Sequence, residues 1–142
     1  MFLFPYRGTD KLDVRWHAKD LEIENLLTKY NMPFKRYETW RSVERQAYLY
    51  DNNKSKIRDG GKHGMGLATD WVLFIDGKWS WGARPTRKQS GATDSEAIRL
   101  NKRDISLYWA KAYIVSGQID GVACGSFWAN FVDHAHHELV NI

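Results

Sequence analysis

Two short polar motifs, more than sixty residues apart, constrain the fold of this chain more than any other feature of its sequence. The first reads His63-Gly-Met-Gly-Leu-Ala-Thr-Asp70, and the second reads Asp133-His-Ala-His136-His-Glu138. Together they offer the imidazoles and carboxylates of a catalytic zinc ion, which takes three protein ligands and keeps a fourth position open for water. If the fold brings the two motifs together, the chain is a zinc hydrolase.

The first motif places a single acid in an apolar stretch. Asp70 lies inside a predicted strand over residues 67–75, and a buried charge is costly unless it is paired or bound to a metal. Gly64 and Gly66 allow the tight turn that would carry the His63 imidazole over the Asp70 carboxylate. The alternative is structural: Asp70 pairs with an arginine, and His63 is an ordinary loop residue.

The second motif lies on a predicted strand over residues 136–140. Side chains alternate along a strand, so His136 and Glu138 share one face and His137 lies on the other. Asp133 precedes this strand and can fold toward the face of His136, and a nearby carboxylate suits the second nitrogen of a metal-bound histidine. The alternative is a polar strand with exposed histidines, and His134 and His137 compete with His136 as ligands.

Length and composition restrict the remaining choices. The 142 residues indicate a single domain over residues 1–142, large enough to bury a core. Because Cys124 is the only cysteine, an intramolecular disulfide and a cysteine-rich zinc site are both excluded. The formal net charge of +4 fits a polyanionic partner, such as nucleic acid, a membrane surface or bacterial cell wall, or ordinary solubility. Nucleic acid is disfavoured because no basic run alternates with stacking aromatics.

The N-terminal segment predicts neither export nor membrane insertion. Residues 1–7 are too short for the apolar core of a signal peptide, and Pro5 interrupts them. No stretch of about 20 apolar residues is present, so no transmembrane helix is expected. We therefore expect the protein to be made in the cytoplasm.

Hydrophobic periodicity and turn residues predict an α+β fold with an antiparallel sheet. Helices are expected over residues 13–30, from Ser42 to about 50, and from about 95 to 116, with an interruption near Asn101 and an end at Gly117. Strands are expected over residues 34–40, 67–75, 78–81 and 136–140, with a hairpin turn at Asp76-Gly77. The segments 51–66 and 82–93 read as loops, the second mobile, and residues 118–125 as turns.

The patterns His-x-x-Gly-x-Ala-x-Asp and Asp-x-x-His-x-Glu resemble the zinc D,D-peptidase and L-alanyl-D-glutamate peptidase family. That family includes vancomycin-resistance D-alanyl-D-alanine peptidases and phage endolysins, and it shares its fold with the hedgehog signalling domain. The resemblance implies a small antiparallel sheet flanked by helices with one zinc site. Carried over by position, His63, Asp70 and His136 are the zinc ligands and Asp133 is the catalytic base.

A third segment, Thr39-Trp-Arg41-Ser-Val-Glu-Arg-Gln46, is similar to a family segment in which an arginine faces the active site. The resemblance makes Arg41 the residue that stabilises the oxyanion, with a surface arginine near a helix N-terminus as the alternative, and Gln46 structural. Trp128 fits as a pocket wall or a core residue. The chain departs from the family pattern where serine, proline and phenylalanine are usual, although no ligand is lost; the residues here are Gly61, Ala135 and His137.

The resemblance implies a zinc metallopeptidase that cuts a peptidoglycan stem peptide. The small, signal-less form favours an L-alanyl-D-glutamate endopeptidase of the endolysin type, expected to be monomeric and to reach the wall after a holin opens the membrane. A D-alanyl-D-alanine carboxypeptidase or dipeptidase on the same scaffold is one alternative, and a non-catalytic, zinc-stabilised binding module is another. The basic loop 82–103 either engages substrate carboxylates or is simply solvated.

Overall fold

The computed structural model describes residues 4–55, 61–81, 102–129 and 132–140. Their centre is an antiparallel sheet in the order β1-β2-β5-β4, with β3 pairing with β2 as well. The strands are β1 (Phe34–Glu38), β2 (Ala68–Ile75), β3 (Lys78–Ser80), β4 (Val122–Cys124) and β5 (His136–Leu139). The helices are α1 (Val14–Lys29), α2 (Val43–Asp51), α5 (Lys102–Gln118) and the 3₁₀ turn η1 (Gly125–Phe127). The prediction of an α+β fold with a small antiparallel sheet is confirmed.

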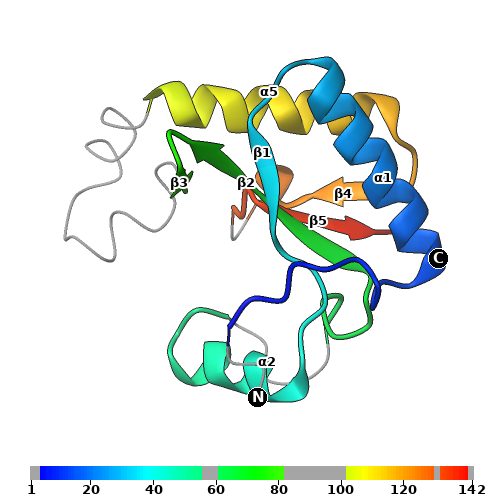
Figure 1. Cartoon of the computed structure of the whole chain (residues 1–142), viewed down its shortest axis with the longest axis vertical. Coiled ribbons are helices and arrows are strands. Elements are labelled where there is room, and N and C mark those ends of the chain that lie inside the picture. The colour runs from blue at the N-terminus through cyan, green and yellow to red at the C-terminus, as the bar shows by residue number, and fades with distance from the viewer. Residues whose placement is uncertain (1–3, 56–60, 82–101, 130–131, 141–142) are drawn as a thin grey trace.

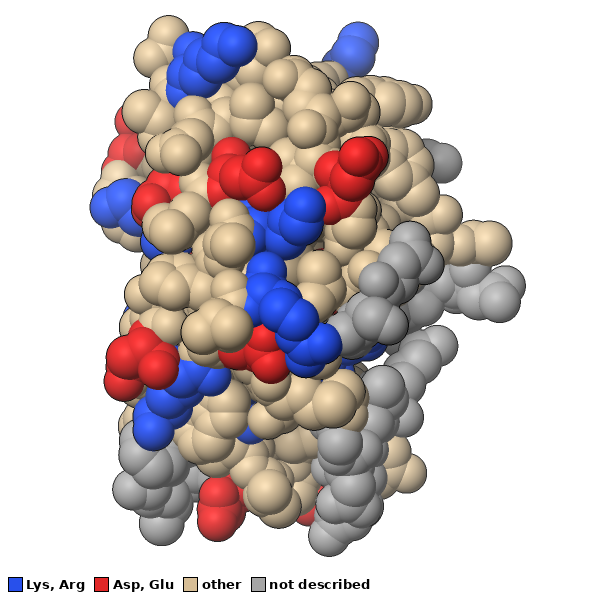
Figure 2. Space-filling view, turned by 90° about the vertical axis from the view of Figure 1, so that its right-hand side faces the viewer, with Lys and Arg blue, Asp and Glu red and all other residues tan. Residues whose placement is uncertain are grey.

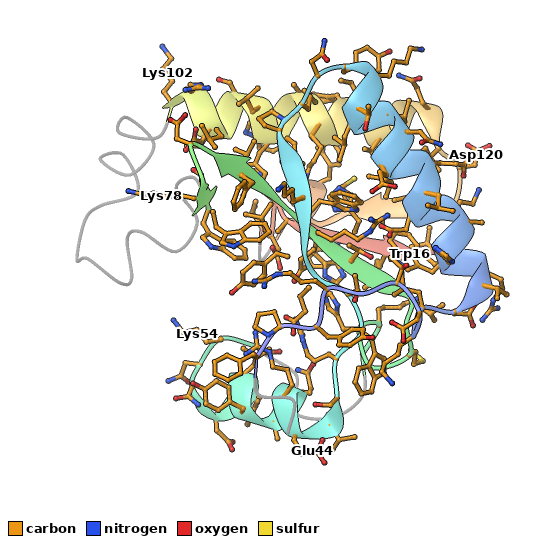
Figure 3. All side chains as sticks on the ribbon, in the orientation of Figure 1. Trp16, Glu44, Lys54, Lys78, Lys102 and Asp120 are labelled. Atoms are coloured by element: carbon orange, nitrogen blue, oxygen red, sulfur yellow. The ribbon has the colours of Figure 1, made fainter. Side chains whose placement is uncertain are left out.

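The two long helices cover one face of the sheet and leave the other face to the polar motifs. Helices α1 and α5 pack together over one face, whereas α2 lies apart, at the other end of the molecule (Figure 1). On β2, Thr69 accepts a hydrogen bond from the Trp16 indole of α1 at 2.9 Å, and the Trp71 indole donates to Asp20 of α1 at 2.9 Å (Figure 3 shows Trp16). This is the helix face, and alternation along β2 turns Asp70 to the opposite face, called here the Asp70 face.

The hydrophobic core lies between the helix face and the two long helices. Burial of such side chains supplies the main favourable free energy of folding. Cys124 belongs to this core, and burial raises the pKa of its thiol to about 11. The fully or almost fully buried apolar members are Trp16, Ile23, Leu27, Trp71, Leu73, Tyr108, Ala112 and Val115.

Two details of the predicted elements are wrong. Helix α5 runs through Gly117 to Gln118, because the amide of Ile119 continues the helical pattern by donating to the carbonyl of Val115 at 3.0 Å. Ile119 is 4% exposed, so its burial outweighs the cost of about 1 kcal/mol for a glycine in a helix. Strand β4 lies in the stretch predicted to be only turns, since three residues are too short for a periodic signal.

Other predictions fall outside the described residues or are met within a residue or two. The loop 82–93, the helix start near residue 95 and the interruption at Asn101 all lie outside the described residues, as does most of the basic loop 82–103. Asp13 is the N-cap of α1 and Ser42 is the N-cap of α2, and each side chain accepts a hydrogen bond from a backbone amide of its helix.

The distribution of surface charge and the length of the helices bear on the expected partners and on the expected absence of a transmembrane helix. Figure 2 shows a face that includes α1, and there the acidic and basic side chains of the described residues are interspersed rather than gathered by sign. None of the helices in the described part of the chain has the length and apolar character needed to cross a membrane.

Candidate metal centre

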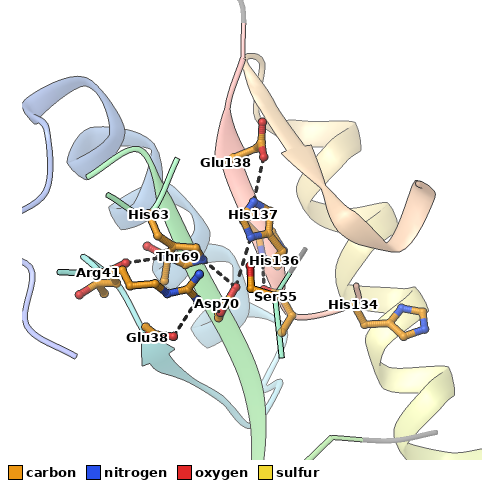
Figure 4. A network of polar contacts seen from close by, with 12 residues as sticks. Glu38, Arg41, Ser55, His63, Thr69, Asp70, His134, His136, His137 and Glu138 are labelled. Atoms are coloured by element: carbon orange, nitrogen blue, oxygen red, sulfur yellow. Dashed lines mark hydrogen bonds and ion pairs between the residues drawn. The ribbon is translucent and has the colours of Figure 1, made fainter. Parts of the chain in front are cut away.

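The two sequence motifs meet on the Asp70 face. Asp70 of β2 lies directly opposite His136 of β5 in the strand register, and His63 approaches from the turn that precedes β2 (Figure 4). The His63 Nε2 and His136 Nδ1 atoms lie 3.2 and 3.4 Å from Asp70 Oδ1. One ligand atom from each of the three residues lies within 4.8 Å of the others, so the sequence prediction that the motifs converge is confirmed.

The turn before β2 depends on a glycine. Gly66 has a φ of +70°, and a Cβ atom there would lie 2.7 Å from the carbonyl oxygen of Lys11. Only glycine tolerates both the backbone conformation and the close approach. The turn is closed by a hydrogen bond of 3.2 Å from the Gly66 amide to the His63 carbonyl, which fixes His63 next to the start of β2.

Both imidazoles are anchored through the nitrogen that faces away from Asp70. His63 Nδ1 lies 2.7 Å from the carbonyl oxygen of Thr39, which can only accept, so Nδ1 carries the hydrogen. His136 Nε2 lies 2.8 Å from Glu138 Oε1. The other two nitrogens, His63 Nε2 and His136 Nδ1, face Asp70. This arrangement of imidazoles held from behind by a carbonyl and a carboxylate is typical of metal-binding histidines.

The electrostatics of the cluster favour a cation. Burial alone would raise the pKa of the Asp70 carboxyl, but the His63 charge and the hydrogen bonds from both imidazoles hold that pKa well below its usual range. Burial would lower the pKa of His136, yet its hydrogen bonds to Asp70 and Glu138 raise it to about 9. Without a metal, a proton on His136 therefore supplies the positive charge that the carboxylates attract. Two imidazoles and one carboxylate fit the ligand preferences of zinc.

Arg41 lies beside this cluster, between β1 and α2. Its Nη2 atom is 2.8 Å from Glu38 Oε1 and 3.7 Å from Asp70 Oδ2, and its Nη1 donates to Gln46 Oε1 at 3.0 Å. Arg45 Nε holds the other oxygen of Glu38 at 2.9 Å. The alternative in which Asp70 meets an arginine thus coexists with its imidazole contacts, and the Arg41 side chain is 12% exposed. Its buried Nε has no hydrogen-bond partner among the described residues.

Asp133 is held just before β5 by its backbone. Its amide donates to the Gly125 carbonyl at 2.9 Å, and its carbonyl accepts from the His136 amide at 3.2 Å. A Cβ on Gly125 would come within 2.2 Å of that Asp133 carbonyl, so the approach requires glycine. The Asp133 charge is one of the groups that raise the pKa of His136, which places it near the cluster. Trp128 is half-buried, its ring centroid 5.0 Å from that of His136, so it forms a wall of the site.

The two competing histidines do not join the cluster. His134 turns away, with its Nδ1 2.9 Å from the Ser126 hydroxyl and its ring stacked on Tyr108 at 5.2 Å (Figure 4). His137 lies on the helix face as alternation predicts, fully buried, and its Nδ1 bonds to the Ala135 carbonyl at 2.8 Å. The alternative of a strand with exposed histidines is wrong, because His134, His136 and His137 are all buried.

Three groups that hold the cluster or Arg41 in place escaped the sequence analysis. Glu38 is 2% exposed and bridges Arg41 and Arg45; its only signal was a single acid in an aromatic stretch. Glu138 was placed on the correct face, but its partnership with His136 Nε2 was not predicted. The Thr39 carbonyl that anchors His63 has no sequence signature, because every residue carries such a group.

An aromatic cluster continues the Asp70 face along β2. Tyr37 lies edge-on to Trp79 and Trp81, with centroid distances of 5.1 and 4.6 Å, and the Arg7 guanidinium lies over Tyr37 at 4.9 Å. Trp79 also meets Phe74, which is on the same face as Asp70 four residues further along the strand. A substrate on this face would therefore lie against aromatic rings next to the cluster.

The α+β fold with its small antiparallel sheet is consistent with a peptidase-like fold. The solved structure of the L-Ala D-Glu endopeptidase ChiX from Serratia marcescens is similar, with a TM-score of 0.53 and 25% sequence identity. The match covers 94% of this chain and 90% of that chain. It supports a fold like that of a peptidoglycan peptidase. No protein-family model and no curated protein matches this sequence.

Proposed function

We propose that this protein is a zinc-dependent peptidoglycan peptidase that hydrolyses the L-alanyl-D-glutamate bond of the stem peptide. The observation that carries the proposal is the cluster of His63, Asp70 and His136. In this cluster one nitrogen of each imidazole is anchored from behind, and the other faces Asp70. The choice of bond rests on the similarity to ChiX, whose name states that activity.

The atoms that converge in this cluster indicate which residues would bind the metal. His63 Nε2, an Asp70 oxygen and His136 Nδ1 would hold zinc, and no thiolate is available nearby because the single cysteine lies in the core. Bound zinc supplies a water whose pKa is lowered to about 7 and a Lewis acid for the substrate carbonyl. Three protein ligands leave a position open, as catalysis requires and a purely structural site does not.

Two further residues act directly on the reacting atoms. Asp133 accepts the proton of the attacking water and passes it to the leaving amine, the usual work of a carboxylate as general base and acid. Arg41 stabilises the negative charge that develops on the carbonyl oxygen. Glu38 and Gln46 hold the Arg41 guanidinium at 2.8 and 3.0 Å, so its position is set before the substrate arrives.

The test is digestion of purified peptidoglycan with and without a chelator, followed by mass spectrometry of the fragments. New fragments that begin with D-Glu or its amide, absent with chelator, are expected. Loss of a terminal D-Ala alone would replace the proposal with a D-alanyl-D-alanine carboxypeptidase. If zinc binds but several wall types stay intact, the protein is a non-catalytic module.

The role of Asp133 has its own test. Asp133→Ala is expected to keep stoichiometric zinc and to lose hydrolysis, because the residue is assigned to proton transfer and not to the metal. Asp120→Ala, which removes an exposed acid, is the matched control and is expected to keep full activity. Full activity in Asp133→Ala would remove Asp133 from the mechanism.

A further inference from the structure

Lys111 of α5 is a fully buried cation beneath the sheet. Its relative exposure is 0%, and its Nζ lies 5.1 and 5.2 Å from the ring centroids of Phe34 and Tyr108. No carboxylate of the described residues pairs with it at salt-bridge distance, and burial lowers its pKa to about 7. A buried amine is costly unless it is hydrogen-bonded, so the group that Lys111 bonds to bears on its role.

The ammonium is bonded to the segment that carries the proposed base. Lys111 Nζ donates a hydrogen bond to the backbone carbonyl of His134, the residue directly after Asp133 and two before His136. That carbonyl is directed into the helix face, away from the metal centre. Lys111 thus reaches the segment that carries the proposed base from the helix side of the sheet.

The neighbouring peptide groups of the segment are fixed in other directions. The Asp133 carbonyl accepts from the His136 amide at 3.2 Å, and the Ala135 carbonyl accepts from the Trp71 amide at 2.8 Å. Between these two, the His134 carbonyl is the one that Lys111 holds, so the carbonyls of three consecutive residues are all hydrogen-bonded. Each bond restricts the rotation of its peptide plane and so limits the positions open to the Asp133 side chain.

We propose that Lys111 is a positioning residue for the peptidase reaction: by bonding to the His134 carbonyl it sets the place of the Asp133 carboxylate relative to the metal held by His136. The inference rests on the proposed function and adds a residue from the opposite face of the sheet. The charges of Asp133 and Asp70 both act on the Lys111 amine, which agrees with its place behind the site.

The experiment compares Lys111→Met, which keeps the length of the side chain and removes the donor, with Lys111→Gln, which keeps a neutral donor. For Lys111→Met we expect zinc stoichiometry and KM as in the wild type, a melting temperature equal or higher, and a kcat lower by roughly 10- to 100-fold, the effect of a small misplacement of a catalytic group. Lys111→Gln is expected to recover part of the lost kcat.

A packing control separates positioning from stability. Val115→Ala truncates another fully buried residue of α5 that lies in the hydrophobic core. It is expected to lower the melting temperature and leave kcat unchanged, the opposite of the Lys111→Met pattern. Wild-type kcat in Lys111→Met, or a kcat that falls only in proportion to lost zinc, would overturn the proposal.

A second measurement does not depend on activity. In metal-free protein, Lys111→Met is expected to speed hydrogen exchange at the amides of Asp133 and His136, while amides in the β1–β2 pairing exchange as in the wild type. Unchanged exchange at these two amides contradicts the proposal even if the wild-type protein cleaves no peptidoglycan. If the wild type is inactive while exchange does increase, the proposed function fails and the anchoring of the segment stands.

Discussion

Two aspartates lie on opposite faces of the same sheet, Asp20 fully buried and Asp70 largely buried, and they are held in different ways. Asp20, on the helix face, is 0% exposed; it accepts a hydrogen bond from the Trp71 indole at 2.9 Å and pairs with Arg36 Nε at 2.7 Å. Asp70, on the other face, is met by the imidazole nitrogens of His63 and His136 at 3.2 and 3.4 Å.

The partners decide what each acid can do. Arginine and tryptophan remain donors at every physiological pH, so the Asp20 interactions are permanent and complete. Imidazoles lose a proton readily and then become metal ligands, so the Asp70 interactions can be exchanged for a metal ion. Burial raises the pKa of Asp20 despite Arg36, whereas the imidazoles lower the pKa of Asp70 despite its burial. A buried acid is thus a structural anchor in one place and a candidate ligand in the other.

The largest expected effect is on the metal at Asp70. Asp70→Ala is expected to weaken zinc binding by more than about 1000-fold, beyond the roughly 10–100-fold typical of groups behind the ligands, and to abolish hydrolysis. Zinc titration by competition with a chromophoric chelator measures it. If this variant still binds stoichiometric zinc at micromolar protein concentration, Asp70 is not a ligand and does not differ from Asp20 in that respect.

The reciprocal substitution tests Asp20. Asp20→Ala removes the acceptor of the Trp71 indole and one of the two carboxylates that pair with Arg36, while Glu24 remains. The unfolding free energy is therefore expected to fall by about 3 kcal/mol, the lower end of the loss when one partner of a buried pair is removed. Urea denaturation of metal-free protein measures the loss. Zinc stoichiometry is expected to stay at the wild-type value, and a loss of zinc affinity as large as in Asp70→Ala would show that the faces are not separate.

A smaller effect is expected behind the ligands. Glu138→Gln replaces the acceptor of the His136 Nε2 hydrogen bond with a weaker one, so zinc affinity is expected to fall roughly 10- to 100-fold. Glu44→Gln, at an exposed acid of α2, is the control and is expected to bind zinc as the wild type does. Equal affinities in the two variants would remove Glu138 from the site.

The smallest expected effect is the release of a proton when zinc binds. The pKa of His136 is raised to about 9, so at pH 6 this imidazole carries a proton that zinc must displace, and at least about one proton per zinc is expected to be released. At pH 6 a zinc-bound water with a pKa of about 7 keeps its protons, so it does not contribute most of the release. Calorimetry in buffers of different ionisation enthalpy measures this number. Release near zero would show that the site is not charged as described.

Local patterns predicted the parts of the site that depend on a few neighbouring residues. The period of two placed His136 and Glu138 on one face, and the apolar context of Asp70 marked it as an acid in need of partners. The shared site of the two motifs was implied only by the resemblance, and the pairing of β2 with β5 was not predicted, since no local signal states which strands are neighbours. Glu38 escaped because its role exists only once Arg41 and Arg45 converge on it.

The single thiol of the chain has a consequence for the chemical surroundings in which such a site can work. Cys124 is buried, and its raised pKa keeps it protonated and unreactive at neutral pH. The candidate ligands are nitrogen and oxygen atoms, which oxidants do not convert as they convert thiolates. A metal ion held by these three residues would therefore not be released by oxidants that act on thiolate ligands.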